Sequence, residues 1–185
     1  MKDQGMWQDI ERIVIDEDTL AARVKELAEE ITSDYWGKEL LMAGVLKGAV
    51  VFYSQLAVRI QTPVQMDFIS VTSYGTSSES SGVVRILKDL DTNIEGKHVL
   101  VVEDIVDTGL TLSHLKEILM TRQPASLKIC SMLDKPSRRK VDMKPDYCGF
   151  EIPDVFVVGC GLDYAGRYRN LPVVGELKRS VYAGG

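Results

Sequence analysis

The stretch that decides the fold is HVLVVEDIVDTGLT, residues 98–111, because it changes from a buried strand to a helix within a few residues. Its apolar residues Val99–Val102 are typical of a strand that is covered on both faces. The adjacent carboxylates Glu103 and Asp104 follow directly, and a short loop then leads into the helical pattern of residues 110–121. A buried strand that runs through a tight loop into a helix is the unit from which parallel α/β sheets are built.

The rest of the chain repeats this alternation of short apolar runs and amphipathic segments. Segment 18–36 places Leu20, Val24, Leu27 and Ile31 at helical spacing, with polar residues between them. The remaining pattern predicts strands at 39–46, 64–74, 83–87, 98–102, 126–133 and 155–159, helices at 49–60 and 110–121, and an irregular segment after residue 159. We therefore expect an α/β fold with an open, mostly parallel sheet flanked by helices, which binds its ligands at the carboxyl ends of the strands.

Composition limits the classes of protein to consider. The chain has 185 residues, of which 45% are hydrophobic and 26% charged, as expected for one globular domain spanning 1–185. A net charge of −5 and a pI near 5.1 disfavour binding to nucleic acid, which needs a concentrated basic face. No apolar run is long enough to span a membrane, and the first residues lack a signal-peptide pattern. We expect a cytoplasmic protein in which Cys130, Cys148 and Cys160 are reduced.

The loop after the two carboxylates has the features of a phosphate site. Backbone N–H groups at residues 107–111, with the helix N-terminus and two threonine hydroxyls, suit a phosphate monoester. Glu103 and Asp104 are acceptors, so they suit ribose hydroxyls or the waters around a divalent cation. The structural alternative is that Asp107 only caps the helix and that the two carboxylates are solvated. With two histidines and no GxSxG motif, chemistry must rest on carboxylates, lysines and backbone amides.

At this point the sequence resembles a known family. VVEDIVDTGLTL (101–112) is similar to the phosphoribosyl-diphosphate-binding motif of type I phosphoribosyltransferases. LKG (46–48), SYGTSSESSG (73–82) and the segment 134–172 resemble, in order and spacing, the hypoxanthine and hypoxanthine-guanine phosphoribosyltransferases, and the resemblance covers nearly all of 10–177. It implies the type I phosphoribosyltransferase fold, with a core sheet and a small hood, built from the chain ends, over the base site.

The resemblance also implies a phosphoribosyl site. Glu103 and Asp104 would bind the ribose hydroxyls, and the loop that starts at Asp107 would bind the 5′-phosphate. Asp107 would also accept the proton that the purine sheds at N7. The loop 46–48 would hold the diphosphate and contain a cis peptide bond between its first two residues. The nucleotide-binding residues implied are Leu46, Lys47, Gly48, Ser73, Tyr74, Glu103, Asp104, Ile105, Val106, Asp107, Thr108, Gly109, Leu110, Thr111 and Arg169.

A second group of residues would bind the base and the metal. Lys135 would donate to the 6-oxo oxygen, Phe156 would stack on the purine, and Val157 would offer backbone groups to its Watson–Crick edge. Asp163 would lie beside the base and bind Mg²⁺ directly, and the implied metal ligands are Glu103, Asp104 and Asp163. The implied reaction transfers the phosphoribosyl group to N9 of hypoxanthine, and of guanine, giving IMP or GMP and diphosphate.

Ordinary structural interpretations exist for several of these segments. Lys47-Gly48 could be a simple turn, Phe156-Val157 could be core packing, and the loop 73–82, which would close the site as a lid, could be a hairpin tip. We interpret Arg138–Lys140 as a solvated charged face.

Other functions share part of the pattern. An orotate or adenine phosphoribosyltransferase would share 99–111 but not 134–163, and a regulator that senses phosphoribosyl diphosphate should carry a nucleic-acid-binding region. A Rossmann dinucleotide site is disfavoured because Gly159-Cys-Gly161 lacks the third glycine. Leu110, where some relatives have lysine, leaves the preference among hypoxanthine, guanine and xanthine open. We expect a homodimer or homotetramer.

Overall fold

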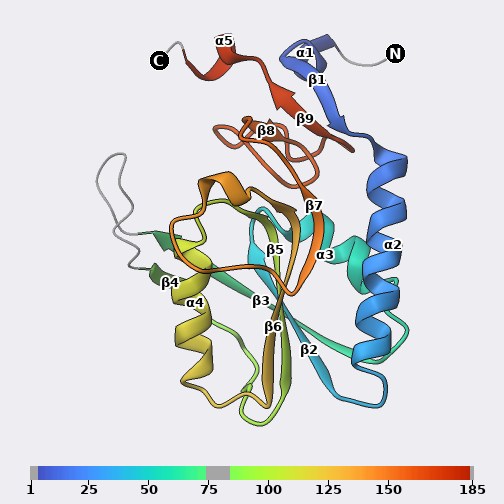
Figure 1. Cartoon of the computed structure of the whole chain (residues 1–185), viewed down its shortest axis with the longest axis vertical. Coiled ribbons are helices and arrows are strands. Elements are labelled where there is room, and N and C mark those ends of the chain that lie inside the picture. The colour runs from blue at the N-terminus through green and yellow to red at the C-terminus, as the bar shows by residue number, and fades with distance from the viewer. Residues whose placement is uncertain (1–3, 74–83, 184–185) are drawn as a thin grey trace.

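The strands among the described residues form two sheets, one of six strands and one of three (Figure 1). This computed structural model describes residues 4–73 and 84–183. In chain order the elements are α1 (Gln4–Trp7), β1 (Ile10–Ile15), α2 (Glu17–Asp34), β2 (Leu40–Leu46), α3 (Val50–Ala57), β3 (Val64–Ser73), β4 (Val84–Lys88), β5 (His98–Val106), α4 (Leu110–Met120), β6 (Ser126–Asp134), the 3₁₀-helix η1 (Pro136–Arg138), β7 (Tyr147–Glu151), β8 (Val157–Val158), β9 (Val174–Leu177) and α5 (Arg179–Tyr182).

The six-stranded sheet has the order β4-β3-β2-β5-β6-β7. Its neighbouring strands are parallel, except that β4 pairs antiparallel with β3 at one edge. The sheet is flanked by helices, so the expectation of an open, mostly parallel α/β fold is confirmed. Because the strands are parallel, their carboxyl ends meet at one edge, which we call the carboxyl edge, and their amino ends at the other, the amino edge.

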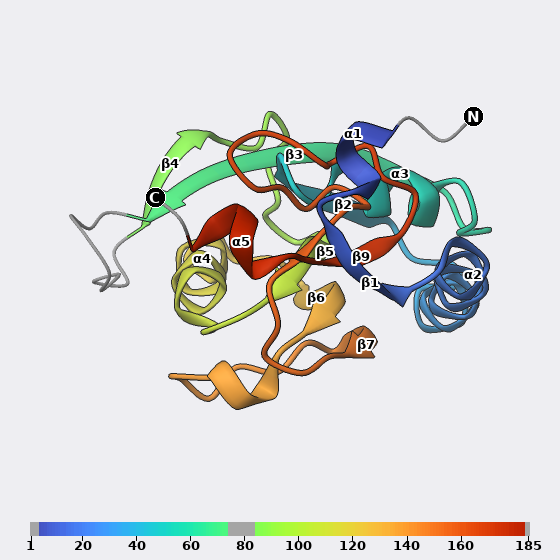
Figure 2. The ribbon, with the colours of Figure 1, turned by 90° about the horizontal axis from the view of Figure 1, so that it is seen from above.

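Alternating residues of the strands pack against helices on opposite faces. In β2, Leu40 and Met42 join the cluster that contains α2 and α3, whereas Leu41 and Ala43 join the cluster that contains α4. Figure 2 shows α2 and α3 on one side of the sheet and α4 on the other. This double burial explains why the central strands are continuous apolar runs. No helix among the described residues is both long and apolar enough to cross a bilayer.

The smaller sheet, β1-β9-β8, is antiparallel and takes strands from both ends of the chain. We call residues 4–15 and 157–182, which contain this sheet with α1 and α5, the hood. Its own apolar cluster is built around Val158, Tyr168, Leu171 and Leu177. The hood lies beyond the carboxyl edge of the large sheet (Figure 1), so the space between the two sheets is where a ligand of an α/β protein is expected.

The sequence-based boundaries are wrong mainly near the chain ends. The strand predicted at 155–159 is only the two-residue β8, and it belongs to the hood. The irregular C-terminal segment contains β9 and α5, while β1 and β7 were not predicted at all. These strands are short, and β1 and β9 form only when distant parts of the chain pair, so local patterns carry little signal for them.

Candidate active site

The loop after β2 lies against the carboxylates at the end of β5. The peptide bond between Leu46 and Lys47 is cis, as the resemblance predicts. A Cβ at Gly48 would overlap the carboxylate of Asp104, and a Cβ at Gly161 would overlap the carbonyl oxygen of Gly48. Only glycine fits in these two places, because the backbones and the carboxylate approach too closely for a side chain. Residues from β2, β5 and the hood therefore converge at one point.

Glu103 and Asp104 form a partly buried acidic pair at this point. Burial raises the pKa of both carboxyls, and the charge of Asp104 raises the pKa of Glu103 further. The positive charge of Arg169 acts in the opposite direction on the pKa of Asp104. Their hydrogen bonds come from the backbone N–H groups of Asp104, at 3.1 Å, and Ile105, at 2.7 Å. An acidic pair whose ionised form is disfavoured in this way suits added hydroxyl donors or a cation.

The loop after β5 encloses a small polar cavity of about 110 Å³. The cavity is lined by Glu103, Ile105, Val106, Asp107, Thr108, Gly109, Thr111 and Leu112. Gly109 lies at the N-cap of α4 with a φ of 79° and has no side chain to cap the helix, whereas the Thr108 hydroxyl accepts a hydrogen bond of 3.4 Å from the Leu110 N–H. The alternative that Asp107 only caps the helix is therefore wrong. The N-terminus of α4 and the two threonines give this cavity the character of an anion site.

The carboxylate of Asp107 is instead held by a neighbouring segment. Arg138 donates to Asp107 Oδ1 at 2.7 Å and lies 3.4 Å from Asp154 Oδ2. Arg138 is 45% exposed and Asp107 is 43% exposed, so this ion pair is accessible to solvent. One oxygen of Asp107 is thus oriented by a guanidinium at the rim of the site.

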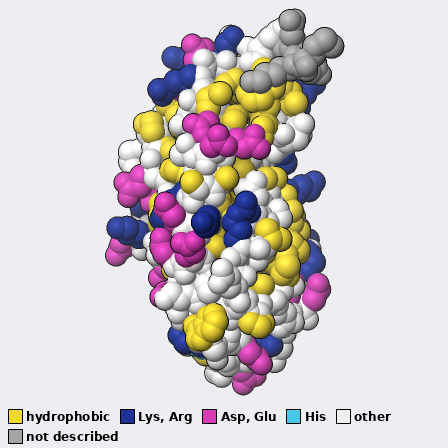
Figure 3. All heavy atoms as spheres, turned by 90° about the vertical axis from the view of Figure 1, so that its right-hand side faces the viewer, with side chains coloured by type: hydrophobic (Ala, Val, Ile, Leu, Met, Phe, Trp, Pro, Cys, Tyr) yellow, Lys and Arg dark blue, Asp and Glu magenta, His cyan; other side chains and the backbone are white. Residues whose placement is uncertain are grey.

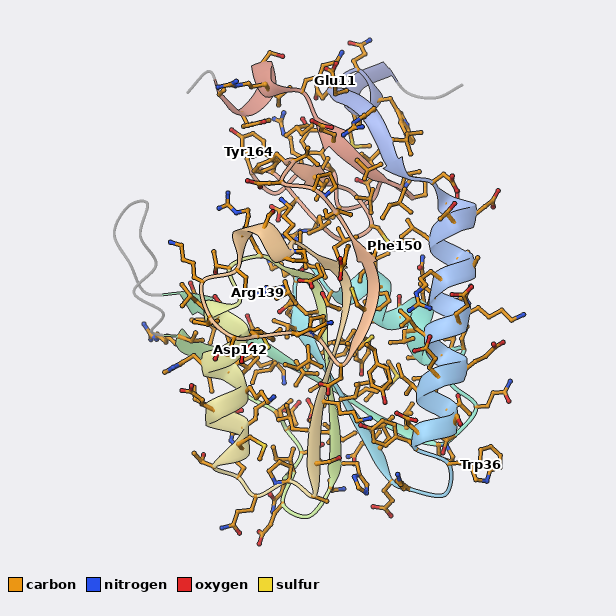
Figure 4. The ribbon with its side chains drawn as sticks, viewed as in Figure 1. Glu11, Trp36, Arg139, Asp142, Phe150 and Tyr164 are labelled. Carbon is orange, nitrogen blue, oxygen red and sulfur yellow. The ribbon has the colours of Figure 1, made fainter. Side chains whose placement is uncertain are left out.

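Arg139 corrects the interpretation of residues 138–140 as a solvated face. Its side chain is only 14% exposed, pairs with the buried carboxylate of Asp134, and donates to the main-chain oxygen of Asp107 at 2.7 Å. The N–H of Lys140 adds a bond of 3.0 Å to the Thr108 oxygen. Figure 4 shows Arg139 over the middle of the molecule, beside α4. The arginine braces the loop that forms the polar cavity.

Lys135 is the most deeply buried basic side chain in residues 135–141. It is 7% exposed, and its Nζ donates to the Val155 oxygen at 2.6 Å and lies 3.8 Å from Asp154 Oδ1. Burial lowers the pKa of Lys135. The backbone N–H of Lys135 bonds to the Val106 oxygen, next to Asp107. Lys135 therefore lies at the carboxyl edge with an ammonium group suited to an acceptor on a ligand.

Phe156 and Val157 lie where the chain enters the hood. Val157 is buried and packs into the main core, as the structural alternative predicted, whereas Phe156 is 37% exposed and is not simple core packing. Phe156 contacts the rings of Tyr164 and Tyr182. The neighbouring strand β9 is fixed by a bond of 2.8 Å from the Leu177 N–H to the Phe156 oxygen. An exposed aromatic ring is thus held on a rigid sheet.

Asp163 and Arg169 form an ion pair of 2.6 Å. Asp163 also accepts from the Gly166 N–H at 2.8 Å, and Arg169 donates to the Gly161 oxygen at 2.6 Å. The structure does not gather Glu103, Asp104 and Asp163 into one metal centre: within 4–73 and 84–183 no three acidic, histidine or cysteine side chains are close enough to hold a metal ion. The residues still fit Mg²⁺, which commonly takes one or two carboxylates with waters and substrate phosphates.

Of the remaining predicted site residues, the structure describes some and not others. Ser73 is the last residue of β3, and Lys47 is exposed in its loop. Tyr74 and the rest of the predicted lid, which spans 73–82, lie outside the described residues. Sequence reasoning missed Arg139, Gly161 and Tyr182. A close approach between a glycine and another part of the backbone cannot be predicted from the neighbouring residues in sequence. The basic residues around Arg139 have the composition of an ordinary exposed surface.

Comparisons with known proteins agree with this geometry. Residues 14–165 match the model of the phosphoribosyl transferase domain. The chain is 54% identical to the hypoxanthine-guanine phosphoribosyltransferase of Bacillus subtilis, over 96% of this chain and 98% of that protein. It is 47% identical to the enzyme of the same name from Streptococcus thermophilus, over 95% and 97% of the two chains. A crystal structure of a hypoxanthine phosphoribosyltransferase from Staphylococcus aureus superposes with a TM-score of 0.96, at 46% identity, over 98% of this chain and 99% of that chain. The chain therefore belongs to the hypoxanthine-guanine phosphoribosyltransferases within the phosphoribosyl transferase domain family.

Proposed function

We propose that this protein transfers the 5-phosphoribosyl group of phosphoribosyl diphosphate to N9 of hypoxanthine and guanine. The observation that carries the proposal is the position of Lys135. Its backbone is bonded beside the phosphate loop, while its buried ammonium donates to the oxygen of Val155, the residue before Phe156. A cation in that place matches the 6-oxo oxygen of a purine whose ribose 5-phosphate occupies the cavity below.

The phosphoribosyl moiety is bound by the carboxyl edge of the large sheet. The N–H groups and hydroxyls of residues 107–111 hold the 5′-phosphate, and Glu103 and Asp104 accept hydrogen bonds from the ribose hydroxyls. Leu46, Lys47, Gly48 and Arg169 hold the diphosphate. The contacts of Arg169 with the Gly161 carbonyl and with Asp163 support this role.

The base is bound between the core and the hood. Lys135 donates to the 6-oxo oxygen, Phe156 stacks on the ring, and the backbone of Val157 meets the N1 edge. Asp107 takes the N7 proton, because N9 becomes nucleophilic as that proton leaves and one oxygen of Asp107 is free of Arg138 Nε. When bound, Mg²⁺ would neutralise the leaving diphosphate, with Asp163 as its protein ligand and Glu103 and Asp104 near it.

The test is a comparison of five bases, hypoxanthine, guanine, xanthine, adenine and orotate, with purified protein. Nucleotide formation from phosphoribosyl diphosphate and Mg²⁺ should be seen with hypoxanthine and guanine, and the rate with xanthine would define the remaining preference. Adenine should give a kcat/KM lower by about 10⁴-fold, since its amino group meets the Lys135 ammonium, a donor without an acceptor. Equal use of adenine, or transfer only to orotate, would contradict the proposal.

We also propose that residues 1–185 form one domain that assembles into a homodimer or homotetramer in the cytoplasm. Exposed apolar side chains on neighbouring elements support the assembly: Val50 and Val58 at α3, Met66 on β3 and Leu87 on β4. In Figure 3, basic and acidic side chains are interspersed on the visible face, which does not favour nucleic acid as the partner. Light scattering would give the mass of the particle, and a single cooperative melting transition is expected.

A further inference from the structure

The C-terminal helix carries an aromatic ring against the residue proposed to stack on the base. Tyr182 and Phe156 are stacked, with ring centroids 4.8 Å apart and an angle of 21° between planes. Tyr164 contacts Phe156 edge-on, at 5.7 Å and 88°. Offset stacked and edge-on contacts are the two favoured geometries of aromatic pairs. The orientation of the Phe156 ring is therefore fixed by two neighbours.

Tyr182 approaches Phe156 from the hood. It packs against the hood cluster together with Tyr164 and Val181, whereas Val157, the residue after Phe156, packs into the core of the large sheet. In Figure 1, α5 lies at the top of the molecule, beyond β8 as seen from the large sheet. Phe156 remains 37% exposed despite both contacts. The ring thus keeps free surface for a ligand while Tyr182 covers it from the hood.

The helix that carries Tyr182 is tied to the backbone of the hood. The N–H of Leu177 bonds to the Phe156 oxygen, the N–H of Lys178 bonds to the Asp9 oxygen at 2.8 Å, and α5 starts at the next residue. The Val181 N–H then bonds to the Lys178 oxygen at 2.9 Å. Tyr182 is consequently held near Phe156 by main-chain bonds from the end of β9 to Phe156 and to Asp9, the residue before β1.

We propose that Tyr182 is a positioning residue for the base: it holds the Phe156 ring in the plane in which that ring stacks on the purine. The inference rests on the proposed function, because it assumes that Phe156 contacts the base. A ring that is ordered before binding loses less side-chain freedom when the base binds. Substitution of Tyr182 should therefore weaken the affinity for the base. An aromatic pair contributes about 0.5–1.5 kcal/mol, which corresponds to about a 2–12-fold change in affinity.

The experiment compares four variants in steady-state assays with hypoxanthine and phosphoribosyl diphosphate. Tyr182→Ala should raise the KM for hypoxanthine about 2–12-fold, while kcat and the KM for phosphoribosyl diphosphate change less than about twofold. Tyr182→Phe keeps the ring and should restore the KM. Val181→Ala is the matched control, because it shortens the neighbouring side chain of α5, which packs on the hood cluster but has no aromatic ring to stack on Phe156. It should leave all three parameters unchanged.

Phe156→Ala separates failure of the inference from failure of the proposed function. If Phe156→Ala raises the KM for hypoxanthine and Tyr182→Ala does not, Tyr182 has no positioning role and the base site stands. A lower KM in Tyr182→Ala would show that Tyr182 occupies the place of the base and overturn the inference. If Phe156→Ala changes nothing, the base site and the inference both fall. Direct binding of IMP, measured by calorimetry, should weaken in Tyr182→Ala by the same factor as the KM rises.

Discussion

Carboxyl groups at the two edges of the large sheet have their pKa values shifted in opposite directions. At the amino edge, Asp34 accepts hydrogen bonds from Tyr147 at 2.6 Å and Lys128 at 2.9 Å, and these bonds lower its pKa. At the carboxyl edge, Glu103 and Asp104 lie side by side and burial raises their pKa values. The carboxylate of Asp34 has its hydrogen-bond donors within the protein. Glu103 and Asp104 instead suit donors or a cation that a ligand would bring.

Cavity size alone would place the functional site at the amino edge. The larger hollow, about 930 Å³, is at the amino edge and is lined by residues such as Trp36, Lys38 and Lys97. The cavity at the phosphate loop is about 110 Å³. Figure 4 shows Trp36 at the far end of the molecule from Tyr164 and the hood. Electrostatics and backbone geometry therefore locate this site better than volume does.

The largest expected difference between the edges is in catalysis. Asp107→Asn should lower kcat by about 10–10⁴-fold, the range for loss of a general base, and leave nucleotide binding largely intact. Asp34→Asn, the matched change at the amino edge, should keep kcat within about twofold and lower Tm instead, because it weakens the bonds to Lys128 and Tyr147. Steady-state kinetics and thermal melting of both variants test this. An Asp107→Asn enzyme with full kcat and reduced stability would make Asp107 a structural residue.

A smaller effect is expected for base recognition. Lys135→Ala should raise the KM for hypoxanthine by about 10–100-fold, since a hydrogen bond to a charged group contributes about 1.5–3 kcal/mol. The KM for phosphoribosyl diphosphate should change much less, and adenine should stay a poor substrate because the Val157 carbonyl, which we propose meets the N1 edge, would face an acceptor there. Kinetics with each substrate varied in turn would show the split. Equal changes in both KM values would mean that Lys135 acts through the loop and not on the base.

The raised pKa of Glu103 predicts a modest gain of stability on substitution. A carboxyl whose pKa is higher in the folded state binds more protons there, so the free energy of unfolding falls as pH rises from its unfolded pKa through its folded pKa. Glu103→Gln removes the ionisable group and with it this fall in the free energy of unfolding. Without substrates or divalent ions, Tm at neutral pH should rise by about 2–4 °C, the shift that about 1 kcal/mol produces in a chain of this size. The gain should shrink toward pH 4, and a gain independent of pH would refute the electrostatic cause.

The smallest effect is expected at the larger cavity. Trp36 is 71% exposed at its rim, so Trp36→Ala removes little packing and should change kcat and both KM values by less than about twofold. The measurement is the same assay used for the other variants. A loss of activity comparable to that of Lys135→Ala would show that the amino edge takes part in function and would break the contrast between the edges.

The parts of the molecule that could be predicted are those in which neighbours in sequence are neighbours in space. Strand β5, its carboxylates and the loop into α4 are contiguous, so residues 98–111 carried both the fold and the phosphate site. The hood pairs β1 with β9 from opposite ends of the chain, and no local pattern indicates that pairing. Arg139 was misread for a different reason: its partner Asp134 is close in sequence, but only the folded chain shows that the pair is shielded from water.

The bonds from Arg139 and Lys140 to the loop at Asp107 and Thr108 have a consequence for altering base preference by directed evolution. Segment 135–141 contains Lys135, which we propose binds the base, and it also braces the loop proposed to bind the 5′-phosphate. We therefore expect most substitutions there to be eliminated through weaker phosphoribosyl diphosphate binding before any new preference appears. Phe156 and Tyr182 belong to the aromatic group above the base and have no such bonds to that loop among the described residues. A library restricted to these two positions would vary base selection while the phosphoribosyl half of the site stays intact.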